Sequence, residues 1–339
     1  MEKTISWKEL GFRYVDTGAY VRADFRAGAW SSLELTEGTG LQLHIAATCL
    51  HYGQACFEGL KAFRQVDGRV ACFRADTHAR RMIMSGRRLA MVPPPEELFL
   101  DAVRMIVKRN DAYVPPYGTG ATFYIRPLLI GTSAVIGVHP SEEYAFLVFG
   151  MPVGPYYKDG MVPVRAYVQE EYDRAAPHGV GHVKAAGNYA AGLVGDMAVK
   201  EKGYPVSLYL DSATHSFVDE FGTSNFIGIT RDGAYVTPKS ASILESVTND
   251  SLRTIAKEMG LRVEHRPIRW SELENFVEIG ACGTAAVITP ICSITRGDTT
   301  LRFGSEDKPG KTLQQLYDKI QGIQYGRIED RHGWMMPVA

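Results

Sequence analysis

Apolar residues in the first half of the chain recur at helical spacing and then gather in two strand-like runs. In the segment 76–91 they return every three or four positions, which predicts a helix that ends before the three prolines at 93–95. A second helix is predicted over 95–110. The runs 121–131 and 143–153 are rich in aromatic and β-branched residues and predict strands. We therefore expect the first half to form a mixed α/β domain.

The second half mixes the two patterns in the same way. Its clearest helix is 245–260, where Leu252, Ile255 and Met259 lie on one apolar stripe before Gly260. The tripeptide RDG reads as a hairpin turn between two strand-like runs. Further helices are expected over 190–198 and 311–326, and strands over 206–211, 217–230 and 234–238.

The segment 154–163, GPYYKDGMVP, combines glycine, proline and paired tyrosines and suits a connection between domains. We therefore expect a smaller N-terminal domain over 1–153 and a larger C-terminal domain over 164–339. The expected fold class is α/β.

Charge and composition narrow the classes of partner. Lys and Arg total 37 against 38 Asp and Glu, so no broad positive field is present to hold nucleic acid or an anionic membrane. The five cysteines form no CxxC pair and the nine histidines show no metal-ligand spacing. The start of the chain lacks the apolar core of a signal peptide, and the apolar stretch 123–138 contains Arg126. We expect a cytoplasmic protein without a metal that binds small molecules or other protein chains.

One lysine stands among small residues in the segment HVKAAGNYA at 182–190. If Lys184 is desolvated or lies beside another cation, part of it is neutral and can form a Schiff base with an aldehyde. The alternative is a surface lysine in a loop before a helix. The local sequence alone favours that alternative.

Several segments could supply partners for an anionic or cationic ligand. Asp219 and Glu220 are adjacent in an apolar strand, so one would point inward and need a partner such as a protonated ring nitrogen, unless the strand is a solvated edge. Segment 245–251 begins a helix, where N–H groups favour phosphate. The Gly-Thr turn in 280–287 could approach a ligand closely. Arg81 could bind the same phosphate, or could belong to a solvated basic face.

Aromatic residues and one arginine suggest a pocket. Tyr52, Phe57, Tyr124, Arg126 and Tyr156 would give apolar walls and one cation, which suits an amino acid with an apolar side chain, although such residues also form plain core. The dinucleotide fingerprint and the P-loop motif are both missing, which disfavours nucleotide-binding folds.

Taken together and in order, these segments resemble the branched-chain amino acid aminotransferases, within the class IV (fold type IV) pyridoxal-phosphate enzymes. The resemblance implies two mixed α/β domains with the active site at their interface, and a homodimer or a higher assembly. The matching segments run from about residue 20 to about residue 330 and are LHYGQACFEGLKAFR, ARRMIMSGRRLAM, FYIRPLLIG, VGPYY, VKAAGNYA, DEFGTSNFI, ESVTNDSL and GACGTAAVITP.

The resemblance implies roles for individual residues. Lys184 would hold pyridoxal 5'-phosphate as a Schiff base, Glu220 would face the ring nitrogen with Asp219 on the other face, and Tyr189 would bond the phenolic oxygen. Phosphate binding is implied for Arg81, Val247, Thr248 and Thr284. Substrate binding is implied for Tyr52, Phe57, Tyr124, Arg126, Tyr156, Thr223, Thr284 and Ala285.

The implied reaction is a reversible ping-pong transfer of the amino group from L-leucine, L-isoleucine or L-valine to 2-oxoglutarate. We expect Arg126 and tyrosine hydroxyls to bind the second carboxylate of 2-oxoglutarate, and Phe57 and its neighbours to receive the apolar side chain. Animal members carry a CxxC pair after the Gly-Thr turn, but this chain reads GTAAVITP, so no thiol switch is predicted.

Three other functions stay open at this point. A D-amino acid or amine transaminase and the lyase that makes 4-aminobenzoate from aminodeoxychorismate would keep Lys184 and Glu220 but change the pocket. A non-catalytic binding protein is the third. The segments HYGQACFEGLKAF and YIRP favour the branched-chain reading.

Overall fold

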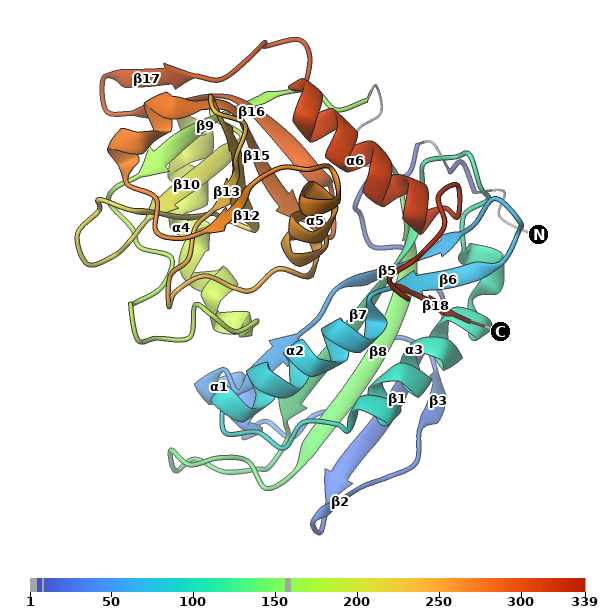
Figure 1. Cartoon of the computed structure of the whole chain (residues 1–339). Coiled ribbons are helices and arrows are strands. Elements are labelled where there is room, and N and C mark those ends of the chain that lie inside the picture. Colours follow the sequence, from blue (N-terminus) through green and yellow to red (C-terminus); the bar gives the residue numbers. More distant parts are fainter. Residues whose placement is uncertain (1–4, 8, 156–159, 339) are drawn as a thin grey trace. The chain divides into compact units, whose positions relative to one another are not determined.

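A computed structural model describes residues 5–7, 9–155 and 160–338 (Figure 1). The chain forms two compact units. The first contains Met1–Lys158, Lys184–Gly187 and Gly322–Ala339, and the second contains Asp159–Val183 and Asn188–Gln321.

The unit boundaries differ from the expected domains at two segments. Lys184–Gly187 and Gly322–Ala339 were expected in the C-terminal domain but belong to the first unit. The reason is backbone pairing within that unit, because Ala185 forms an isolated bridge with Cys56 and strand β18 (Met335–Pro337) pairs with β6 (Val70–Phe73). The expected linker at 154–163 includes residues 156–159, which lie outside the described residues, so it stays a prediction.

The first unit is built on an antiparallel sheet in the order β18-β6-β5-β7-β8-β1-β2, with β3 beside β1 and β4 beside β7. Helices α2 (Ala75–Arg88) and α3 (Glu96–Arg109) lie along it (Figure 1) and close the core around Phe99, Phe123 and Phe146. The remaining elements are β1 (Ala19–Arg26), β2 (Ala29–Trp30), β3 (Glu34–Glu37), α1 (Thr48–Tyr52), β4 (Ala55–Phe57), β5 (Leu60–Arg64), a 3-10 turn (Asp111–Tyr113), β7 (Thr122–Gly131) and β8 (Tyr144–Val153).

These bounds confirm the two helices and two strands predicted from the first half of the sequence. The first helix ends where Ala90 adopts a positive φ of 53° just before the three prolines. The second carries Glu96 and Glu97 in its first turn and Lys108 and Arg109 in its last, as the helix dipole favours.

The second unit is built on a mixed sheet in the order β11-β10-β9-β16-β15-β12-β13-β14, with β17 beside β16. An additional pairing of β11 with β12 closes part of this path into a ring around the core of Phe221, Phe226 and Ile294. The strands are β9 (Val164–Gln169), β10 (Val206–Leu210), β11 (Val218–Phe221), β12 (Ser224–Thr230), β13 (Tyr235–Thr237), β14 (Val263–His265), β15 (Phe276–Gly283), β16 (Val287–Arg296) and β17 (Thr299–Arg302).

Three helices and a 3-10 turn complete the description: α4 (Ala186–Glu201), α5 (Val247–Glu258), α6 (Lys311–Gln324) and Trp270–Asn275. The three helices expected in this half are confirmed, with α4 longer than 190–198. The expectation of one strand over 217–230 was wrong. Phe221 pairs with Ser224, so Gly222 and Thr223 form a two-residue turn that divides the segment into β11 and β12.

Candidate active site

The backbone of Lys184 is bonded to two other elements of the first unit. Its N–H donates to Ser85 Oγ on α2 at 3.0 Å, and its carbonyl accepts from the Phe57 N–H of β4 at 3.2 Å. Its ammonium group lies 4.8 Å from the centre of the Phe57 ring. The main chain of Lys184 is therefore held in place through both its N–H and its carbonyl group.

The surroundings of Lys184 favour its neutral form. Burial lowers the pKa of its amine to about 8, with the positive charge of Arg81 acting in the same direction and Glu58 opposing it. An amine with this pKa is partly neutral near pH 7 and can attack an aldehyde. These surroundings favour the Schiff-base interpretation over that of a solvated lysine.

Arg81 is buried, and so it is not part of a solvated basic face. Its Nε and Nη2 donate to the two carboxylate oxygens of Glu58 at 2.7 and 2.8 Å, and His78 Nδ1 lies 2.7 Å from Glu58 Oε2. Burial alone would raise the pKa of Glu58, but the charge and hydrogen bonds of Arg81 and His78 hold it well below its usual range.

Sequence reasoning missed Glu58 and His78. Two signals were available. His78 precedes Arg81 by three positions and so shares its helix face, and Glu58 is a lone carboxylate between apolar and small residues.

Arg126 is packed between two aromatic rings of the first unit. Its guanidinium carbon lies 4.6 Å from the centre of the Phe57 ring and 5.3 Å from that of Tyr124. Its Nη2 donates to the Tyr124 hydroxyl at 2.9 Å. Its Nε is buried and has no hydrogen-bond partner among the described residues. Phe57, Tyr124 and Arg126 are thus brought together as expected, with a donor left for a ligand.

Gly59 leaves the space that the Tyr124 hydroxyl occupies. A Cβ at this position would overlap that hydroxyl and lie 2.9 Å from the ring carbon that carries it. Gly59→Ala should therefore displace the Tyr124 ring and cost about 1–3 kcal/mol of unfolding free energy, measured by urea titration.

Two further variants test this explanation. Tyr124→Phe should restore part of the stability in the Gly59→Ala background, because it removes the overlapping hydroxyl. Gly40→Ala is the control, since no atom lies within 4 Å of its Cβ position. Equal losses in the two alanine variants would contradict the proposed clash.

The other two tyrosines expected around the substrate are less informative. Tyr52 is exposed at the end of α1, and its hydroxyl donates to the carbonyl of Ile136. Tyr156 lies outside the described residues.

In the second unit, Glu220 is a buried carboxylate on β11. It pairs with Arg174 at 2.7 Å and accepts hydrogen bonds from Asn225 Nδ2 at 2.8 Å and the Leu244 N–H at 3.3 Å. Burial raises the pKa of Glu220, and the charge of Arg174 only partly opposes this. Asp219 is also buried, and its Oδ1 has no hydrogen-bond partner among the described residues. The interpretation of this segment as a solvated edge strand is therefore wrong.

Arg174 and Asn225 were missed by sequence reasoning. Arg174 is distant from Glu220 in the chain and carries no local signal. Asn225 follows the hairpin turn, and its place opposite Glu220 became visible only with the strand pairing.

Hydrogen bonds join Glu220 to the start of α5. Ser246 caps this helix by accepting from the Asn249 N–H at 3.2 Å. The Asn249 side chain donates to Asn225 Oδ1 at 3.4 Å, and Asn225 in turn bonds Glu220. Val247 and Thr248, the first two helical residues, are buried beside this network. The second unit thus presents a helix N-terminus next to a buried carboxylate.

Two turns of the second unit lie at the same end of its sheet. Asn225 pairs with Cys282, so the turn containing Thr223 is adjacent to the turn after β15 that contains Thr284 and Ala285. Tyr189 lies on α4 and is half-buried. The residues expected to bind the cofactor thus fall in two sets, with Lys184 and Arg81 in the first unit and the others in the second.

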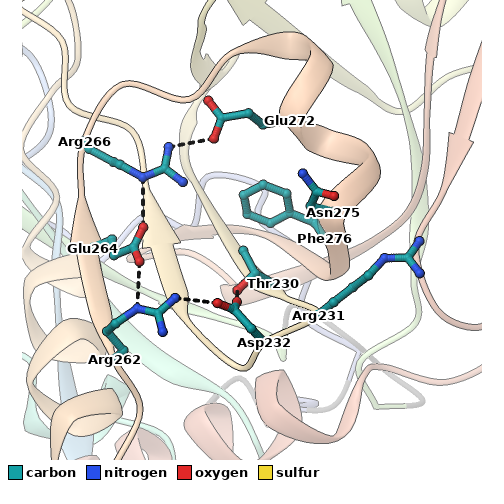
Figure 2. Close-up of a pocket in the computed structure, with 9 residues that line it drawn as sticks. All are labelled: Thr230, Arg231, Asp232, Arg262, Glu264, Arg266, Glu272, Asn275 and Phe276. Carbon is teal, nitrogen blue, oxygen red and sulfur yellow. Dashed lines mark hydrogen bonds and ion pairs between the residues drawn. The ribbon is translucent and has the colours of Figure 1, made fainter.

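A pocket of about 340 Å³ in the second unit contains none of the expected residues (Figure 2). Its wall carries a chain of ion pairs that runs Glu272, Arg266, Glu264, Arg262, Asp232, with distances of 2.7–2.8 Å. This chain brackets the short strand β14 at the sheet edge, and each of its two arginines lies between two carboxylates. We interpret it as a structural feature of that edge.

The described residues include no helix with the length and hydrophobicity of a membrane span. They also include no group of three or more His, Cys, Asp or Glu side chains able to hold a metal ion.

Comparison with known proteins defines the class. Residues 55–294 match the family model of the class IV amino-transferases. The chain belongs to this family, whose members use pyridoxal 5'-phosphate, and the predicted fold class and cofactor are confirmed.

Comparisons with individual proteins indicate a narrower class within this family, the branched-chain aminotransferases. The chain is 44% identical to the branched-chain-amino-acid aminotransferase of Haemophilus influenzae and 45% identical to that of Helicobacter pylori, over 99% of each chain in both comparisons. It also matches the crystal structure of the branched-chain amino acid aminotransferase of Escherichia coli, with a TM-score of 0.79, 25% identity and coverage of 94% of this chain and 99% of that one. The resemblance inferred from the sequence is confirmed.

Proposed function

We propose that this chain transfers the amino group of L-leucine, L-isoleucine or L-valine reversibly to 2-oxoglutarate. The observation that carries the proposal is the setting of Lys184. Its amine has a pKa of about 8 and lies beside a buried arginine and an aromatic ring of the same unit. The similarity to two branched-chain aminotransferases along nearly the whole chain supports the choice of substrate.

The donor groups present fit pyridoxal phosphate. Lys184 offers an amine for its aldehyde, and Glu220 offers a buried carboxylate for a protonated ring nitrogen. The guanidinium of Arg81, the first N–H groups of α5 at Val247 and Thr248, and the Thr284 turn offer donors for phosphate. Tyr189 offers a hydroxyl for the phenolic oxygen. When bound, the cofactor supplies an aldehyde that accepts the amino group and a ring that withdraws electrons from the substrate α-carbon.

Lys184 and Glu220 would then have separate roles in the reaction. Lys184 Nζ would hold the cofactor in the resting enzyme, and its free amine would accept the proton from the substrate α-carbon. Glu220 would hold the proton on the ring nitrogen, with Arg174 and Asn225 fixing its carboxylate. Asp219 has no part in this scheme.

Substrate recognition would rest on the aromatic pair around Arg126. Phe57 and Tyr124 give an apolar surface for a branched side chain, and Arg126 Nε is a buried donor with no partner among the described residues. Tyr52, Tyr156, Thr223, Thr284 and Ala285 complete the proposed set. A carboxylate of 2-oxoglutarate would satisfy the unpaired donor, whereas leucine has no second carboxylate to offer.

Replacing Arg126 by glutamine tests this assignment. The KM for 2-oxoglutarate should rise about tenfold or more, because a charge-assisted hydrogen bond is lost, while kcat/KM for leucine should change much less. Steady-state rates at varied concentrations of each substrate measure both. Arg80→Gln on the exposed face of α2 is the matched control. Equal losses for the two substrates would refute the role of Arg126.

The function itself is tested by a panel of amino donors. Purified enzyme loaded with pyridoxal phosphate is given 2-oxoglutarate with L-leucine, L-isoleucine, L-valine or D-alanine, and glutamate formation is measured. A separate assay with aminodeoxychorismate follows 4-aminobenzoate. We expect turnover with the three branched-chain L-amino acids. A preference for D-alanine, or release of 4-aminobenzoate, would replace the proposal by the corresponding alternative.

Two properties stay predictions. We propose a homodimer on the basis of the family resemblance, and a cytoplasmic location on the basis of five cysteines that form no CxxC pair.

A further inference from the structure

Glu58 is a completely buried carboxylate, 0% exposed, for which the proposed function has no task. It follows β4, and its N–H donates to the Pro127 carbonyl at 2.8 Å, which fixes its main chain against β7. One oxygen accepts from Arg81 Nε at 2.7 Å, and the other accepts from Arg81 Nη2 at 2.8 Å. This is a two-point contact between planar groups.

A two-point contact fixes the plane of a guanidinium as well as its position. Arg81 would otherwise be a long side chain with about 2 kcal/mol of rotamer entropy to lose when it binds a ligand. Held by Glu58, it has lost that freedom before any ligand arrives.

His78 supports Glu58 from the same helix face as Arg81. Its Nδ1 lies 2.7 Å from Glu58 Oε2, and burial lowers the pKa of the imidazole despite the nearby carboxylate. A neutral His78 therefore donates its Nδ1–H to Glu58. The Gly59 N–H also donates to Oε2 at 3.3 Å. The carboxylate thus has four donors on its two oxygens and little freedom to turn.

We propose that Glu58, supported by His78, is a positioning residue that holds the Arg81 guanidinium in the orientation that binds the phosphate of pyridoxal phosphate. This inference rests on the proposed role of Arg81. It adds that Glu58, a carboxylate that does not touch the cofactor, controls the affinity for the phosphate through Arg81.

The test compares pyridoxal phosphate with pyridoxal, which lacks the phosphate. Cofactor-free full-length enzyme and its Glu58→Gln and Glu58→Asp variants are titrated with each compound, and Kd is followed by tryptophan fluorescence. The glutamine keeps the shape without the charge, and the aspartate keeps the charge but is one carbon shorter. We expect both to weaken pyridoxal phosphate about tenfold or more and to leave pyridoxal within about twofold.

Arg81→Gln separates failure of this inference from failure of the proposed function. The quantity compared is the affinity for pyridoxal phosphate divided by the affinity for pyridoxal. If Arg81→Gln leaves this ratio unchanged, Arg81 does not bind phosphate and its proposed role fails. If Arg81→Gln lowers the ratio and the Glu58 variants do not, only the inference fails. Glu58→Gln added to Arg81→Gln should lower the ratio no further, because both act through one contact.

A purely structural role predicts a different pattern. Variants that lose affinity equally for pyridoxal phosphate and pyridoxal, or two Glu58 variants that both fail to fold, would overturn the proposal. Glu96→Gln, which removes a partly exposed partner of Arg80 from the neighbouring helix, is the control and should change neither affinity.

Discussion

Replacing Lys184 by alanine should reduce kcat with leucine and 2-oxoglutarate by a factor on the order of 10⁶, as loss of a covalent nucleophile does in other enzymes. The same amine is proposed both to bind the cofactor and to move the α-proton, so no other group can take over either task. The rate of glutamate formation measures the loss. A second measurement is independent of turnover: borohydride reduction of the loaded wild-type enzyme should leave a phosphopyridoxyl label on Lys184, identified by peptide mass mapping.

The first unit offers a matched control in Lys61 on β5. Burial lowers the pKa of this amine to about 8 as well, so Lys61 and Lys184 are equally good nucleophiles by that criterion alone. Only Lys184 has the charge of Arg81 acting on it. Lys61→Met should keep both turnover and the label. A label on Lys61, or turnover that survives Lys184→Ala, would exclude the proposed mechanism.

Glu220→Gln should lower kcat about 100-fold or more without lowering stability. The loss of rate follows from the proposed task, because an amide cannot keep a ring nitrogen protonated. The label on Lys184 should persist, since the lysine is intact. Steady-state kinetics and borohydride labelling measure the two effects.

The expectation for stability follows from the direction of the Glu220 pKa. Because the pKa is raised in the folded protein, the folded state binds the proton more tightly than the unfolded state does. Its contribution to stability is therefore full below the unfolded pKa of about 4.5 and is lost as pH rises through the folded pKa. Above the folded pKa the ionised carboxylate costs stability, and a neutral glutamine avoids that cost. Thermal unfolding of the cofactor-free proteins at pH 7 should give Glu220→Gln a Tm equal to or above that of wild type.

Asp219→Asn is the control for both effects. Burial raises the pKa of Asp219 too, so this variant should also keep or raise the Tm. Its side chain has no proposed task, so kcat should stay near the wild-type value. A loss of rate in Asp219→Asn equal to that in Glu220→Gln would show that the two carboxylates were assigned incorrectly.

Many helices and strands could be predicted from local sequence patterns, because their formation depends mainly on residues that are close together in the chain. The spacing of apolar residues placed α2 and α3, and the aromatic and β-branched runs placed β7 and β8. The Ser246 start and the apolar stripe placed α5. The prediction for segment 217–230 was wrong because the polar residues after Gly222 were included in one strand. The pairing of Phe221 with Ser224 shows that a turn lies there.

The sequence by itself determined the secondary structure of the long segments, the family and the identities of the residues proposed for the cofactor. The tertiary structure alone decided which charges are buried and with whom. Glu58 and Arg81, and Arg174 and Glu220, are pairs of residues that are distant in sequence and joined by hydrogen bonds or ion pairs of 2.7–2.8 Å. A pKa depends on burial and on such neighbours, neither of which a linear pattern records. The chemistry proposed for Lys184 and Glu220 therefore depends on partners that only the folded chain brings to them.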